Sequence, residues 1–226
     1  LHVLKYLYST SDYGICFHSF ANPNIQAFNH FPHHHDKEAY SDATPPAPAD
    51  CHQLTAYSDA CWGGQFGNDI PDSTPLELFK YRFLSGYIIC CAGGPIAWKA
   101  IRQTQTASSS CVAEINATHE CINDLLSIKN RALDLGMSDA AKTITVYNDN
   151  KSAVDWASSV TLKGTKHINL HECCVREQHQ NKTIQVTHIP GVINSSDLFT
   201  KEIKDAAHFR RCRDSFMVSK ANFMMY

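Results

Sequence analysis

The sequence lacks the segments that would place it in a membrane or a secretory pathway. It contains no run of about 18 apolar residues, the length a membrane-spanning helix needs, and no charged segment followed by an apolar leader. Its ten cysteines include no C-x-x-C spacing, and two pairs are adjacent, which suits neither a zinc ribbon nor a disulfide scaffold. We therefore expect a soluble intracellular protein with reduced, mostly buried thiols.

A strong net charge is also absent, because the formal net charge of the 226 residues is only −2 at pH 7. The charges are nevertheless unevenly distributed. Residues 142–213 contain eleven Lys and Arg against seven Asp and Glu, whereas residues 1–141 contain eight against fourteen. A local basic excess can contact phosphates, but it also fits an ordinary solvated surface.

The first fifty residues differ in character from the rest. Apolar residues at near-helical spacing predict a short helix at the start of the chain. Residues 21–53 are rich in Asn, Pro, His and Ala, which predicts a linker or an extended loop. The histidine cluster HFPHHH at residues 30–35 lies in this linker, where such tracts rarely bind a functional metal ion.

From residue 54 onward the pattern is regular and predicts alternating strands and helices. The predicted elements, in chain order, are a strand over 54–59, a hairpin that turns at 93–95, a helix over 111–135, a strand ending at 149, a helix over 151–159, a strand over 183–191 and a helix from about 195. This order describes an α/β layer fold with a mixed sheet, and 43% hydrophobic residues are sufficient for its core.

Four acidic residues occur at the ends of these elements. Asp59 and Asp149 each end a predicted strand, which suggests a shared acidic site. Glu114 and Asp197 each lie in the first turn of a predicted helix, where an acid can also simply interact with the helix dipole. Taken one at a time, each acid keeps such a structural explanation.

Six motifs in a fixed order carry a resemblance to a known family: YSDACW, SGYIICCAGGPIAWKA, SSSCVAEINA, VYNDNKSAV, GTKHI and SSDLFTK. Over residues 54–201 they resemble the ribonuclease H domain of a Copia-type (LTR) retrotransposon Pol polyprotein. The opening LKYLYSTSDYGICF resembles the end of the reverse transcriptase that precedes such a domain. The resemblance implies a reverse transcriptase tail over 1–20, a linker over 21–53, a ribonuclease H-like domain over 54–215 and a C-terminal tail over 216–226.

The resemblance also implies a fold and an activity. The fold is α/β and ribonuclease H-like, with a mixed five-stranded sheet flanked by helices. The activity is metal-dependent hydrolysis of the RNA strand of RNA·DNA hybrids during reverse transcription. The catalytic and metal-binding residues it implies are Asp59, Glu114, Asp149 and Asp197. Crowded carboxylates without His or Cys ligands favour Mg²⁺ or Mn²⁺, and two such ions can activate water and stabilise the leaving oxygen.

The expected partners are the RNA·DNA hybrid and the reverse transcriptase portion of the same polyprotein, with no membrane. The expected location is the cytoplasm, including virus-like particles. Basic residues that we expect to contact the hybrid backbone are Lys151, Lys163, Lys166 and Arg176.

The sequence departs from the family pattern at several places. The loop over 65–81 is longer than expected, and GTKHI is followed by Cys173 where the family has a second histidine. The loop before Asp197 also lacks the helper histidine of cellular ribonucleases H. The roles of His167, His171 and His188 therefore stay open.

Two alternative functions also stay open. A non-catalytic connection-type module would bind hybrid without cutting it, although the presence of all four acids argues against this. An integrase- or transposase-like nuclease would need three acids and an attached zinc or DNA-binding segment. Residues 167–174 imitate a zinc set only weakly, because they lack C-x-x-C.

Overall fold

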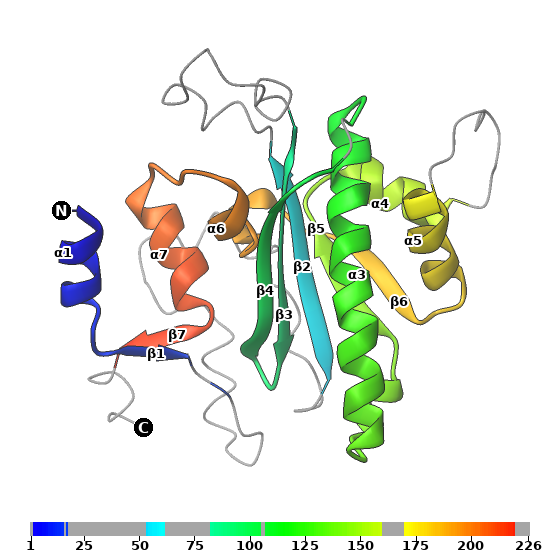
Figure 1. Cartoon of the computed structure of the whole chain (residues 1–226), viewed down its shortest axis with the longest axis horizontal. Helices are drawn as coiled ribbons and strands as arrows, with labels where there is room; N and C mark the ends of the chain where they lie inside the picture. The colour runs from blue at the N-terminus through cyan, green and yellow to red at the C-terminus, as the bar shows by residue number, and fades with distance from the viewer. Residues whose placement is uncertain are drawn as a thin grey trace.

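A mixed five-stranded sheet forms the centre of the molecule (Figure 1). The computed structural model describes residues 2–15, 17, 53–61, 82–104, 107–159 and 170–219. The sheet order is β4-β3-β2-β5-β6. β2 pairs antiparallel with β3 and β3 with β4, whereas β2 with β5 and β5 with β6 are parallel. The strands are β2 (Leu54–Cys61), β3 (Leu84–Cys91), β4 (Gly94–Arg102), β5 (Ile144–Asn148) and β6 (Ile184–His188).

Helices cover both sides of this sheet (Figure 1). On one side lie α3 (Ser110–Asp134), α4 (Lys151–Ser158) and α5 (Leu170–Gln180), and on the other lie α6 (Asp197–Thr200) and α7 (Ala206–Asp214). Two short 3-10 helices, η3 (Ser138–Ala141) and η4 (Gly191–Ile193), connect elements. Within the described residues, none of the helices has the length and apolarity that crossing a membrane requires.

Local sequence explains the long helix α3. The side chain of Ser109 caps it by accepting a hydrogen bond from the Val112 amide, at 3.2 Å. Gly136 follows its end with a φ of +80°, a backbone conformation that glycine adopts readily. Its fully buried residues include Ala117, Cys121 and Leu125, spaced four residues apart, which pack it against the sheet.

The strands and helices predicted from residue 54 onward are largely confirmed. The hairpin turns at Ala92 and Gly93, both at positive φ. The single last helix is wrong, because the chain after residue 196 forms two helices, α6 and α7, separated by an extended segment. All eight cysteines in the described residues are free thiols, and Cys61, Cys90, Cys121 and Cys212 are buried. The linker, the histidine cluster and the loop over 65–81 lie outside the described residues.

The two ends of the described chain form a second, two-stranded sheet. The N-terminal segment contains α1 (His2–Ser9) and β1 (Tyr13–Ile15), and β1 pairs antiparallel with β7 (Met217–Ser219), which follows α7. The sequence indicated neither this pairing nor β7. The proposed division into domains stays a prediction. The strands β1 and β7, which lie before and after residues 54–215 in the chain, pair with each other.

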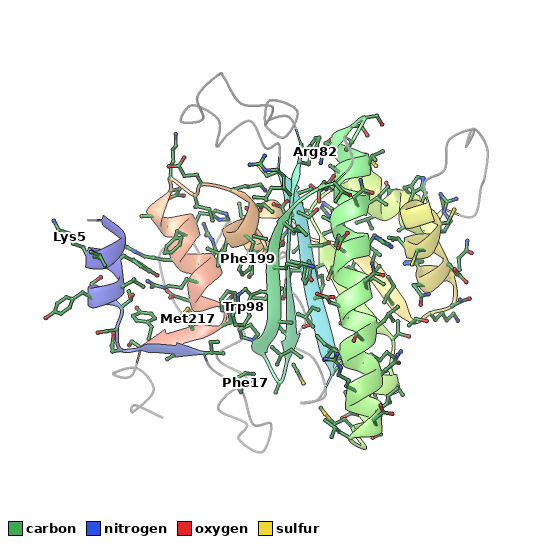
Figure 2. All side chains as sticks on the ribbon, viewed as in Figure 1. Lys5, Phe17, Arg82, Trp98, Phe199 and Met217 are labelled. Carbon is green, nitrogen blue, oxygen red and sulfur yellow. The ribbon has the colours of Figure 1, made fainter. Side chains whose placement is uncertain are left out.

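Gly86 of β3 lies where α6 approaches the sheet. It pairs with Asp59 across the ladder, and a Cβ at this position would lie 2.5 Å from Thr200 Cγ2 and 2.9 Å from Phe199 Cβ. Figure 2 shows Phe199 beside the sheet. The missing side chain therefore lets α6 pack closely on β3.

We predict that Gly86→Ala lowers the free energy of unfolding by about 1–3 kcal/mol, because the added methyl group must displace α6. Urea denaturation of the parent and the variant measures this. Gly14→Ala is the matched control, since a Cβ at Gly14 meets no atom within 4 Å. Equal losses in the two variants would contradict the close packing of α6.

Candidate active site

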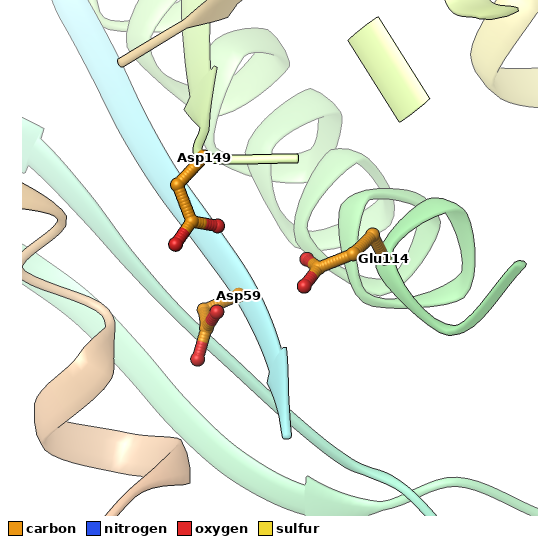
Figure 3. Close-up of side chains that lie close together, drawn as sticks. All are labelled: Asp59, Glu114 and Asp149. Atoms are coloured by element: carbon orange, nitrogen blue, oxygen red, sulfur yellow. The ribbon is translucent and has the colours of Figure 1, made fainter. Parts of the chain in front are cut away.

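Three carboxylates converge at one end of the central strands (Figure 3). Ser58 of β2 and Asn148 of β5 are parallel partners, so Asp59 and Asp149, the next residues, emerge side by side. Glu114 approaches from the first turns of α3. One oxygen from each of the three acids lies within 4.8 Å of the others, and no second group of three metal-ligating side chains this close occurs within the residues that the structure describes.

The fourth predicted acid, Asp197, is linked to this group through Lys201. The Lys201 ammonium lies 2.6 Å from Asp197 Oδ1, 3.3 Å from Asp59 Oδ1 and 4.0 Å from Asp149 Oδ2. Asp197 and Lys201 are one helical turn apart in the sequence, so their contact follows from local geometry. The structure thus brings Asp59, Asp149 and Asp197 around Lys201, for which the sequence predicted no role.

Two buried asparagines hold the backbone and one of the acids in place. Asn148 Nδ2 donates to Glu114 Oε2 at 3.0 Å and to Ser58 Oγ at 3.2 Å. Asn194 Nδ2 donates to the Ser58 carbonyl at 3.1 Å, which ties the segment before Asp197 to β2. Both asparagines are fully buried, and the N-D-N sequence around Asp149 was the available signal for Asn148.

Two further side chains contact the acids directly. The Thr200 hydroxyl donates to Asp59 Oδ2. His208 Nε2 on α7 lies 3.0 Å from Asp197 Oδ2. No sequence motif points to His208, because it lies on a different helix from Asp197 and after Asp197 in the chain rather than in the loop before it.

The carboxylates are buried deeply enough to disfavour their ionised forms. Burial raises the pKa of Asp59 to about 6, although the Lys201 ammonium acts in the opposite direction. Burial raises the pKa of Glu114 well above its usual range, and the charge of Asp59 raises it further. Burial also raises the pKa of Asp149, again opposed by Lys201.

The same crowding of carboxylates favours the charged form of Lys201. Burial alone would lower the pKa of its ammonium, but the carboxylates of Asp59 and Asp197 outweigh burial and raise the pKa. Lys201 is therefore a permanent cation in the site. One positive charge cannot neutralise four acids, so fully ionised carboxylates need further cations.

The expected substrate-binding residues have different environments. Lys151 is exposed and pairs with Asp155 at 3.2 Å. Arg176 is buried: its guanidinium lies over the Trp156 ring, 4.0 Å from the centroid, and donates to Ser159 Oγ. Its expected contact with the hybrid backbone stays a prediction. Lys163 and Lys166 lie outside the described residues.

The histidines left open by the sequence are only partly described. His188 is exposed, and its Nε2 lies 3.2 Å from the Asp149 carbonyl. His167 lies outside the described residues, as does the side chain of His171. The weak zinc set over 167–174 therefore stays a prediction.

Comparison with curated proteins finds transposon polyproteins. The chain is 28% identical over 151 residues to the retrovirus-related Pol polyprotein from transposon TNT 1-94 of Nicotiana tabacum, and 29% identical over 155 residues to that from transposon RE2 of Arabidopsis thaliana. This chain is a relative of Copia-type Pol polyproteins. The matches cover 66% and 68% of the chain but only 10% of each Pol polyprotein. No family model matches.

Among solved structures, the chain is similar to ribonucleases H. The match to LC11-RNase H1, isolated from compost, has a TM-score of 0.47 and 16% identity and covers 69% of this chain and 98% of that one. The match to the protease-reverse transcriptase of prototype foamy virus has a TM-score of 0.41 and 13% identity and covers 77% of this chain and 21% of that one. The predicted α/β fold, a mixed five-stranded sheet flanked by helices, is confirmed.

We predict that the metal-free protein loses stability as the pH rises. The folded state holds a proton on Asp59 more tightly than the unfolded chain does, so this stabilisation is complete below pH 4 and is lost as the pH rises through about 6. A change in pKa from about 3.9 to about 6 corresponds to about 3 kcal/mol.

Urea unfolding in EDTA between pH 4 and 7.5 measures this loss in the parent and in Asp59→Asn. The variant should show a flatter profile, because its amide does not titrate. Identical pH profiles for the two proteins would mean that Asp59 titrates normally in the fold.

Proposed function

We propose that this chain is the ribonuclease H part of a retrotransposon Pol polyprotein and hydrolyses the RNA strand of RNA·DNA hybrids. The observation that carries the proposal is the convergence of Asp59, Glu114 and Asp149 within 4.8 Å, on a chain related to Pol polyproteins. The proposal includes the reverse transcriptase of the same polyprotein as a partner and a cytoplasmic location.

The donor set fits a hard divalent cation. All three converging groups offer carboxylate oxygens, and neither His nor Cys belongs to the set, which suits Mg²⁺ or Mn²⁺ rather than Zn²⁺. Asp59, Glu114 and Asp149 would hold such ions, two in number, with Asp197 at the edge of the site. Bound there, the ions would supply an activated water and stabilise the leaving oxygen of the phosphodiester.

The protein's own groups hold the carboxylates in position for this role. Asn148 orients Glu114 from β5, and Thr200 orients Asp59 from α6. Lys201 supplies the charge that allows several acids to ionise close together. None of these groups acts as a covalent nucleophile, which agrees with direct attack by water.

We propose that Lys151 contacts a backbone phosphate of the hybrid. Its exposure at the start of α4, two residues after Asp149, supports this role. A non-catalytic module would not need converging carboxylates. An integrase-like nuclease would need an attached zinc or DNA-binding segment besides three acids, and residues 167–174 lack the C-x-x-C spacing of a zinc set.

We predict that Asp149→Asn reduces hybrid cleavage by at least about 100-fold while hybrid affinity changes by less than about threefold, because the amide keeps the shape of the side chain but not its charge. Cleavage assays with Mg²⁺ and binding assays with EDTA separate the two effects. Asp134→Asn, an exposed acid at the far end of α3, is the matched control and should cleave like the parent.

The same assay includes double-stranded DNA and double-stranded RNA as substrates. The parent should cut only the RNA strand of the hybrid. Undiminished turnover by purified Asp149→Asn would refute the site assignment, and equal cleavage of double-stranded DNA would refute the proposed substrate.

A further inference from the structure

The N-terminal segment, residues 2–15 with α1 and β1, packs on α7 and on the β7 strand that follows it. The rings of Tyr6 and Phe209 meet edge to face, with centroids 5.7 Å apart. The Arg213 guanidinium lies 4.4 Å from the centroid of the Tyr13 ring and donates to the Tyr13 hydroxyl at 3.2 Å. The pairing of β1 with β7 adds backbone hydrogen bonds. The segment is thus attached to one side of α7 by both backbone and side chains.

Another set of contacts joins α7 to the loop over 194–197, which carries Asp197. His208 Nε2 lies 3.0 Å from Asp197 Oδ2. The Cys212 thiol donates to the Asn194 carbonyl at 3.8 Å, and the hydroxyls of Ser215 and Ser195 lie 3.0 Å apart. Cys212 is only 1% exposed, so it is covered when α7 lies against this loop.

Asp197 needs this external support because its own helix is short. α6 has only four residues, which makes one turn, and an isolated turn is not stable in water. The loop before it is held by Asn194 to β2 and by α7. A shift of α7 would therefore move His208 and Cys212 away from the loop and release Asp197 Oδ2.

We propose that the N-terminal segment is a positioning element of the acidic site. By fixing α7 it holds His208 and Cys212 against the loop over 194–197 and so sets the position of Asp197. Tyr13 and Arg213 are positioning residues, since neither contacts the acids. The proposal deepens the nuclease function and rests on it for its effect on catalysis.

Loosening the contact between the N-terminal segment and α7 should have only a local effect on the fold. The two-stranded sheet of β1 and β7 is separate from the five-stranded sheet, and a two-stranded sheet alone is only marginally stable. Removing the Tyr13 ring should thus raise the frequency of α7 opening without unfolding the main core.

The test compares Tyr13→Ala with the parent and with Tyr8→Ala in the full chain. Tyr8 lies in the same segment but is 86% exposed, which makes it the matched control. The first readout is the rate at which iodoacetamide alkylates Cys212, located by peptide mass spectrometry. Tyr13→Ala should raise this rate at least about fivefold, whereas Cys121, fully buried in the main core, should keep the parental rate.

The second readout is Mg²⁺ binding and catalysis at the acidic site. Tyr13→Ala should weaken the Mg²⁺ affinity, measured from the Mg²⁺ dependence of the melting temperature, by about threefold or more, and should lower kcat with KM for hybrid within about twofold. Tyr13→Phe keeps the ring beneath Arg213 and should lie between the parent and Tyr13→Ala. This variant also carries the test if Tyr13→Ala is not recovered folded.

Parental alkylation of Cys212 in Tyr13→Ala, together with a parental Mg²⁺ affinity, would overturn the proposal. Equal increases at Cys121 and Cys212 would also overturn it, because they would indicate global destabilisation. If the parent does not cleave hybrid at all, the proposed nuclease function fails. A selective increase at Cys212 would in that case still support the positioning of the loop by the N-terminal segment.

Discussion

Repulsion between buried carboxylates is the constraint on which the site depends. Asp59 and Glu114 are at most 5% exposed, and one carboxylate oxygen from each lies within 4.8 Å of the other and of an oxygen of Asp149. Water therefore screens their charges weakly. Lys201 offsets part of this repulsion and links Asp197 to the group. A divalent cation would supply the remaining positive charge. The arrangement that costs stability without metal is therefore the arrangement suited to bind it.

Local sequence patterns predicted the frame of the site. Strand alternation and the parallel pairing of β2 with β5 place Asp59 next to Asp149, and the capped helix α3 brings in Glu114. The contacts that complete the site were not predictable in this way. Asn194 reaches Ser58 across 136 positions, and His208 reaches Asp197 from another helix, so neither contact leaves a period or a motif in the sequence.

Charge counting could not predict the environment of Arg176. This residue belongs to the basic half of the chain, but its guanidinium is buried against Trp156, and composition cannot distinguish a buried guanidinium from a solvated one. The pairing of β1 with β7 was missed because both strands are only three residues long.

The most direct test of the account is anomalous X-ray scattering from crystals of the protein grown with saturating Mn²⁺. We expect Mn²⁺ bound to carboxylate oxygens of Asp59, Glu114 and Asp149, with the Lys201 ammonium moved away from Asp149. Mn²⁺ bound elsewhere, or Lys201 as the only cation beside Asp59 and Asp149 at saturating Mn²⁺, would contradict a metal site formed by these acids.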